Sequence, residues 1–132
     1  MKTVEEVREY FKGDKFLSHI GMQIDSVDFV RYEAICSVKL ANMHYNAEGG
    51  VQGGVIYTLA DTTFAVSANS TGNVTVTLDG SIRYLNKSAG KKLIAKAKLL
   101  RMSKKVCFYE VNIYDDLDVL VATSNFIGYI KT

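Results

Sequence analysis

The stretch from Val55 to Thr71 constrains this chain most, because its 17 residues include a single charged side chain, Asp61. A helix on the surface of a protein carries a face of Lys and Glu residues, and this stretch has none. Its other polar members are small hydroxyl and amide side chains among alanines and larger apolar residues. The pattern predicts a central helix over about residues 53–71 that is buried on most of its sides.

Two further elements are predicted before the central helix. Thr3 and Glu6 have the spacing of a capping box, and apolar residues recur at helical spacing after them until Gly13. A short amphipathic helix is therefore expected over about residues 3–12. Between Gly21 and Leu40 the apolar residues favour strands on either side of a turn, which predicts a hairpin.

A four-strand meander is predicted after the central helix. Its first strand, over residues 74–84, alternates with period two, so that Val76, Leu78, Ile82 and Tyr84 would share one face. Gly80 is the expected position of a bulge that bends this strand. Three more strands are expected around residues 92–101, 106–114 and 119–130. The predicted class is α+β, with residues 1–132 forming one domain in which a curved antiparallel sheet wraps around the central helix.

The same arrangement predicts a partner. One sheet packed on one apolar helix leaves a flank of that helix open, and a second copy of the chain is the simplest cover for it. We therefore expect an obligate homodimer, with a dimer of dimers as the expected larger assembly.

Composition excludes several classes of function. The 16 basic and 14 acidic residues are interspersed, giving a net charge of +2, which argues against a nucleic-acid partner. No apolar run approaches the roughly 20 residues that cross a bilayer, and the charged N-terminal sequence is unlike a signal peptide, so a cytoplasmic protein is expected. Cys36 and Cys107 lack metal-ligand spacing and are expected to be reduced core residues, and no metal site is predicted. The acidic turn Asp115–Asp118 is interpreted as a hairpin turn.

Chemistry is indicated by the segment from His44 to Asp61, HYNAEGGVQGGVIYTLAD. Gly53 and Gly54 open the central helix, where unpaired backbone N–H groups and the helix dipole can stabilise an oxyanion. Asp61 is expected among apolar neighbours, and a carboxylate there is costly unless it has a function. The alternative interpretation is a structural hydrogen bond to Thr58 or Thr77.

Distance suggests that one site needs two chains. Eight residues separate Gly53 from Asp61, which corresponds to about 12 Å along a helix. One carbonyl group cannot contact both residues of the same chain at about 3 Å. Antiparallel pairing of two central helices would bring Gly53 of one chain opposite Asp61 of the other.

This segment resembles the signature of the PaaI-like branch of the hotdog-fold acyl-coenzyme A thioesterases, roughly H-x-N-x-x-G-x-x-H-G-G-x-x-x-x-L-A-D. The positions in register are His44, Asn46, Gly49, Gly53, Gly54, Leu59, Ala60 and Asp61. The resemblance implies a hotdog fold and hydrolysis of an acyl-coenzyme A thioester. It makes Asp61 the general base or nucleophile, while Gly53 N–H polarises the carbonyl and Asn46 orients that carbonyl or the water. Asn46 can also be interpreted as a residue that stabilises its loop.

The sequence departs from the signature at Gln52, where the family usually has His. Gln can donate a hydrogen bond but does not titrate near neutral pH. Two alternatives therefore stay open: a catalytically weakened acyl-coenzyme A-binding or regulatory protein, and a hotdog dehydratase.

The substrate-binding residues are expected around the same helix and in two basic loops. The acyl group is expected to be aryl or medium-chain, and no cofactor is expected because coenzyme A is part of the substrate. The predicted substrate-binding residues are Gly54, Thr77, Tyr57 and Phe64, with Lys87 and Lys104 for the phosphates of coenzyme A.

Overall fold

The computed structural model describes residues 2–131 and contains three α-helices and six strands there. The helices are α1 (Val4–Phe11), α2 (Lys15–Ile20) and α3 (Gly53–Asn69), with a short 3-10 turn at Asn42–His44. The strands are β1 (Met22–Asp28), β2 (Glu33–Lys39), β3 (Thr75–Tyr84), β4 (Lys92–Met102), β5 (Val106–Asp115) and β6 (Leu120–Ile130).

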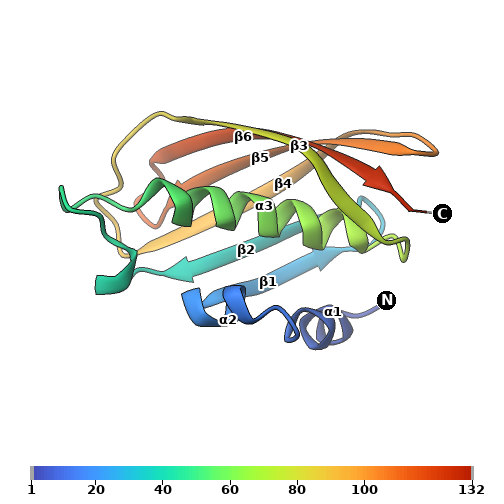
Figure 1. Ribbon diagram of the computed structural model, residues 1–132, viewed down its shortest axis with the longest axis horizontal. Coiled ribbons are helices and arrows are strands. Elements are labelled where there is room, and N and C mark those ends of the chain that lie inside the picture. Colours follow the sequence, from blue (N-terminus) through green and yellow to red (C-terminus); the bar gives the residue numbers. More distant parts are fainter. Residues whose placement is uncertain (1, 132) are drawn as a thin grey trace.

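All six strands form one antiparallel sheet in the order β1-β2-β4-β5-β6-β3. The helix α3 runs along one face of this sheet, while α1 and α2 lie beside β1 (Figure 1). The strand β3 follows α3 in the chain but pairs with the last strand, so the connection from β2 through α3 to β3 passes over β4, β5 and β6. The predicted α+β arrangement of a sheet around a helix is confirmed.

The burial of α3 follows the prediction from its composition. Leu59, Ala60 and Phe64 have no exposed surface, and buried hydroxyls are satisfied within the helix by carbonyls one turn back. The helix ends at Asn69, two residues before the predicted end. Asn69 exchanges two hydrogen bonds with the backbone of Thr75, which fixes the start of β3 against the end of α3.

The bulge in β3 lies at Leu78, and its prediction at Gly80 was wrong. The pairing with β6 shifts by one residue between Thr77 and Asp79. Residues before and after the shift therefore change parity, which also refutes the predicted common face of Val76 and Tyr84. A methyl group at position 80 would lie within 3 Å of both the Phe126 ring and the Tyr57 hydroxyl, so glycine is needed here for close packing.

The helix α2 was not predicted. Its six residues are too few to show a helical period in the sequence. Asp14 caps it by accepting a hydrogen bond from Leu17 N at 3.1 Å, and Gly21 ends it with a left-handed φ of 85°. One half of the capping box predicted for α1 is present, since Thr3 Oγ1 accepts from Glu6 N. The Glu6 side chain accepts from the Thr3 hydroxyl and not from its backbone N–H, so the reciprocal half is replaced by a contact between side chains.

Other sequence predictions concern structural side chains. Cys36 and Cys107 are free and buried, as expected. Asp115 accepts hydrogen bonds from Leu117 N and Val119 N, which confirms the acidic segment as a hairpin turn. His44 is buried, with Nδ1 accepting from Ala41 N and Nε2 donating to the carbonyl of Ile20. Within residues 2–131, no helix is both long and apolar enough to cross a membrane, and no cluster of ligand side chains could hold a metal ion.

Candidate active site

The carboxylate of Asp61 lies on the middle of α3 and is held by β3. Thr77 Oγ1 donates a hydrogen bond to Asp61 Oδ1 at 2.8 Å. Burial raises the pKa of Asp61, the Thr77 hydrogen bond opposes this by lowering it, and the negative charge of Asp14 adds a smaller increase, so that the net shift is upward. The carboxylate of Asp61 therefore accepts a proton more readily than that of an ordinary aspartate.

A cleft with a volume of about 250 Å³ opens beside Asp61. One wall is a single face of α3, and the other runs from the end of α1 to the first turn of α2. The α3 wall comprises Tyr57, Thr58, Asp61, Thr62 and Ala65, and the opposite wall comprises Phe11, Asp14, Phe16 and Leu17. Of the predicted substrate-binding residues, the structure places Tyr57 on this cleft and Thr77 at hydrogen-bonding distance from Asp61.

The glycine-rich start of α3 forms a second cleft, which shares no lining residue with the first. Within the described part of the chain, no group accepts a hydrogen bond from the backbone N–H of Gly53 or Gly54. Tyr84 Oη donates to the carbonyl of Gly53 at 3.0 Å, and a methyl group on Gly53 would lie 3.3 Å from the Tyr84 ring. Because residue 53 is glycine, the Tyr84 ring can pack against the first turn of α3 and bond its carbonyl, while the Gly53 N–H has no partner.

Asn46 and Gln52 flank the second cleft in different ways. Asn46 Oδ1 accepts from Glu48 N at 3.0 Å and from Gly50 N at 3.1 Å, so its carbonyl oxygen stabilises the loop. Only its side-chain N–H groups are left for a ligand. Gln52 is the N-cap residue of α3, but its side chain is exposed and makes no capping hydrogen bond.

The predicted lysines lie at opposite ends of the molecule. Lys87 lines the second cleft, with its side chain beside Gly50. Lys104 lies in the β4–β5 turn, at the end of the sheet where α3 terminates (Figure 1). Only Lys87 is therefore near the glycine end of its own chain.

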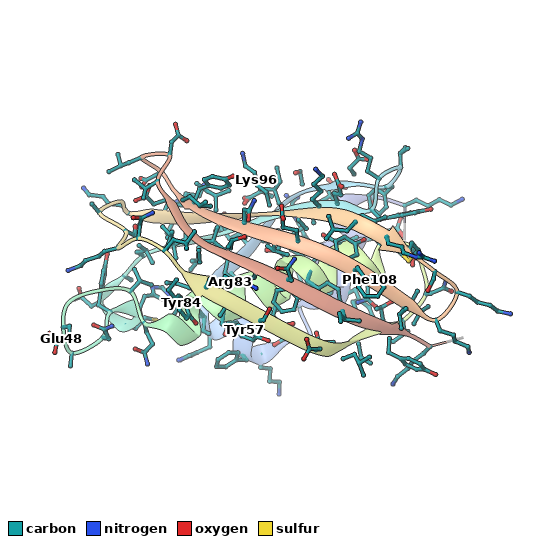
Figure 2. The ribbon with its side chains drawn as sticks, turned by 90° about the horizontal axis from the view of Figure 1, so that it is seen from above. Glu48, Tyr57, Arg83, Tyr84, Lys96 and Phe108 are labelled. Atoms are coloured by element: carbon teal, nitrogen blue, oxygen red, sulfur yellow. The ribbon has the colours of Figure 1, made fainter. Side chains whose placement is uncertain are left out.

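Phe64 faces the sheet and not the Asp61 cleft. Its ring stacks on Phe126 with centroids 5.2 Å apart and meets Tyr109 edge-on at 5.5 Å. With no exposed surface, it contributes to the core and has none to offer an acyl group. Tyr57 and Tyr84 instead lie along the β3 side of the molecule, Tyr84 nearer the loop that carries Glu48 (Figure 2).

Sequence reasoning did not include four residues of this region. Phe11, Asp14, Phe16 and Leu17 reach the Asp61 cleft from a segment that is more than 40 positions earlier in the chain. The sequence holds no clear signal for them, because the exposure of Phe16 and the capping role of Asp14 are visible only in the structure. Tyr84 was missed as well, because the bulge at Leu78 decides that its side chain points toward α3.

The sequence between the two clefts is shared with a known protein family. The family model described as the thioesterase superfamily matches residues 48–122, which include Gly53 and Asp61. The chain belongs to the thioesterase superfamily. It is therefore a thioester hydrolase by family, and the PaaI-like resemblance of its motif is confirmed.

Its relatives in this superfamily come from distant organisms. The chain is 30% identical to a protein of Archaeoglobus fulgidus named only as a candidate esterase, over 92% of this chain and 79% of that protein. It is 26% identical to acyl-coenzyme A thioesterase PaaI of Escherichia coli K12, over 92% and 86% of the two chains. Human acyl-coenzyme A thioesterase 13 is 28% identical, over 83% of this chain and 79% of its own.

Solved structures of similar proteins confirm the hotdog fold. The E. coli PaaI structure matches with a TM-score of 0.90 at 24% identity, covering 97% of this chain and 92% of that one. A hypothetical thioesterase of Streptococcus pneumoniae TIGR4, solved with coenzyme A, matches with a TM-score of 0.84 at 22% identity, covering 93% and 95% of the two chains.

Proposed function

We propose that this thioesterase hydrolyses aryl or medium-chain acyl-coenzyme A thioesters at a site made by two chains. The observation that carries the proposal is the arrangement along α3. A carboxylate with a raised pKa lies in one cleft, and Gly53, whose N–H is free, lines a separate cleft at the start of the helix. The names of the E. coli and human relatives, both acyl-coenzyme A thioesterases, support the substrate class.

In this mechanism Asp61 acts as general base or as nucleophile. As a base, its carboxylate accepts a proton from water, the resulting hydroxide attacks the thioester carbonyl carbon, and the carbon–sulfur bond breaks to release the coenzyme A thiolate. As a nucleophile, Asp61 would attack the carbonyl carbon and expel the coenzyme A thiolate as the carbon–sulfur bond breaks, and water would then hydrolyse the resulting mixed anhydride to the free acid and the Asp61 carboxylate. Thr77 orients the carboxylate in either route, because its hydrogen bond occupies one lone pair of Oδ1.

The electrophilic half of the site comes from the second chain. Its Gly53 N–H donates to the thioester oxygen, and Gly54 N–H lies next to it at the positive end of the 17-residue helix. The amide N–H groups of Asn46 and Gln52 are exposed beside this turn and are the remaining donors for the carbonyl or the water. Lys87 is the cation best placed for a phosphate of coenzyme A bound at the same end.

We further propose a cytoplasmic homodimer that can pair again into a dimer of dimers. Two free, buried thiols are in keeping with a reducing compartment. The edge position of β3 and the separation of the two half-sites support pairing of two chains along this side.

One specific observation favours a second candidate function, an acyl-coenzyme A-binding or regulatory protein with weak turnover. Gln52 replaces the usual His, and its side chain makes no hydrogen bond that would fix it at the helix start. A dehydratase is less well supported, because that chemistry would need the His that Gln52 replaces.

Release of free coenzyme A from a panel of aryl and aliphatic thioesters tests the proposal. Asp61→Asn should lower kcat by at least about 100-fold without changing the sedimentation of the oligomer. The matched control is Asp118→Asn, which removes an exposed carboxylate from a left-handed turn position that Asn also tolerates. Tight binding of thioesters with no turnover by the wild type would favour the binding protein instead.

A second experiment tests whether the site is shared between chains. Gly53→Pro removes the N–H at the first helical position, where proline is well tolerated, and Gly53→Ala keeps the N–H with the same added carbon. Mixing inactive Asp61→Asn with inactive Gly53→Pro should restore about one quarter of the wild-type activity, since half the random dimers hold one intact site of two. A mixture that stays inactive after subunit exchange would place both groups in one chain.

A further inference from the structure

The segment from Phe11 at the end of α1 to Leu17 in α2, called the α1–α2 segment below, covers one side of Asp61. None of its residues belongs to the signature motif. Phe11, Asp14, Phe16 and Leu17 form the wall that faces Tyr57, Asp61 and Ala65 of α3 across the cleft. The polar atoms of the cleft gather around Asp61, Asp14 and the two α3 threonines, and its apolar surface comes from three aromatic rings, one Leu and one Ala.

This wall is fixed at both ends and exposed in the middle. Val7 of α1 is fully buried, and Arg8 Nε donates to the carbonyl of Ile24 in β1 at 2.9 Å. At the other end Ile20 is buried, and its carbonyl accepts a hydrogen bond from His44 Nε2. Phe16 lies between these anchors and is 60% exposed, so its ring is held at the cleft without being used in the core.

A third cavity adjoins the Asp61 cleft at the same wall. It has a volume of about 380 Å³, lies between the N-terminal helices and β1, and shares Phe11, Leu17 and Thr62 with the Asp61 cleft. Met22 and Ile24 add apolar surface to this cavity, and Arg8, Lys12 and Asp25 also line it. An apolar group whose carbonyl lies at Asp61 therefore has room to extend along the wall.

From this geometry we infer that the α1–α2 segment is the acyl-binding wall of the enzyme and that Phe16 determines its preference for apolar acyl groups larger than acetyl. The inference rests on the proposed role of Asp61. The ring of Phe16 loses water when an apolar acyl group packs against it, whereas an acetyl group is too short to leave the carboxylate and reach the ring.

The test compares Phe16→Ala with Tyr129→Ala on three probes, acetyl-, hexanoyl- and benzoyl-coenzyme A. Tyr129 is the control because its ring is 40% exposed on β6 and lines neither the Asp61 cleft nor the cavity beside it. Phe16→Ala should lower kcat/KM for hexanoyl- and benzoyl-coenzyme A by about 10-fold or more and leave acetyl-coenzyme A within about twofold. Tyr129→Ala should leave all three within about twofold.

Two kinetic outcomes would overturn the inference. Equal losses on all three probes would mean that Phe16 supports the site in general, and unchanged kinetics on all three would mean that the acyl group lies elsewhere. Phe16→Leu keeps an apolar side chain on α2 and should recover part of the kcat/KM for hexanoyl-coenzyme A. It replaces Phe16→Ala in the test if the Ala variant does not fold.

A binding measurement separates this inference from the proposed catalysis. The affinity of an inert thioether analogue of hexanoyl-coenzyme A, relative to that of coenzyme A alone, should fall by about 10-fold in Phe16→Ala even if no variant hydrolyses anything. If the wild type hydrolyses thioesters but Phe16→Ala binds the analogue normally, the proposed function stands and the acyl-binding wall is refuted.

Discussion

Replacing Thr77 by Val removes the hydroxyl that donates to Asp61 Oδ1 at 2.8 Å and leaves a side chain of nearly the same shape. That hydrogen bond favours the charged carboxylate and therefore lowers the pKa of Asp61 against the raising effect of burial. Its loss should move the pKa of Asp61 further upward. If ionised Asp61 is the active form, the acid limb of kcat/KM must then move to higher pH.

The size of the effect follows from where Thr77 lies. A hydrogen bond to a charged group contributes about 1.5–3 kcal/mol when water is excluded, and a typical net value is about 0.5–1.5 kcal/mol. Thr77 is exposed, so water can replace part of its hydrogen bond and the lower range applies. That range corresponds to a decrease of about 2- to 13-fold in kcat/KM on the acid limb, where kcat/KM is proportional to the ionised fraction of Asp61, with little change on the plateau.

The assay is a pH profile of coenzyme A release by the wild type, Thr77→Val and Thr77→Ser. The serine variant keeps the hydroxyl donor and should retain the wild-type acid limb, while the valine variant shifts it upward. The reasoning is refuted if Thr77→Val titrates at the same pH as the wild type, or if Thr77→Ser shifts as far as Thr77→Val. Either result would mean that the hydroxyl does not control the protonation of Asp61.

Further expectations concern stability and reactivity. Because burial raises the pKa of Asp61, its charged form lowers the unfolding free energy above that pKa, so Asp61→Asn should raise the urea midpoint at neutral pH. That gain should fade as the pH falls through the folded-state pKa, and equal midpoints at neutral pH would contradict it. Gly80→Ala should lower the free energy of unfolding by about 1–3 kcal/mol, because its methyl group would overlap the Phe126 ring. In contrast, Gly54→Ala meets nothing within 4 Å and should raise thermal stability; equal effects would refute the packing argument. Burial raises the pKa of Cys36 to about 12 and also raises that of Cys107, so neither thiol should react with a thiol reagent at neutral pH before unfolding, and rapid labelling of native protein would show otherwise.

The parts of the fold that sequence predicts well are those that depend on the composition of one segment. The scarcity of charge between Val55 and Thr71 is a local property, and it correctly predicts a long helix enclosed by the sheet. A hydrogen bond from Thr77 to Asp61 is also among the sequence predictions, as the structural alternative to a catalytic role for Asp61. The structure contains that bond, and it is compatible with both interpretations.

The parts that sequence does not predict depend on contacts between distant segments. Gly80 was expected to bend β3, but its lack of a side chain makes room for Tyr57 and Phe126, and the extra residue of the bulge is Leu78. The orientation of Tyr84 follows from that one-residue shift. The α1–α2 wall shows the same limit, because the position of Phe16 next to Asp61 depends on how α2 packs on the finished sheet.

The order of the strands also determines when the candidate site can form during synthesis. The strand β3 is made immediately after α3, yet the strand that pairs with it is β6, the last in the chain. Until β6 leaves the ribosome, β3 has no neighbour in the sheet, and Thr77 has no fixed position from which to hold Asp61. The hydrogen bond at the carboxylate is therefore among the last to form, and a nascent chain that stops before Leu120 would contain every motif residue without an assembled site.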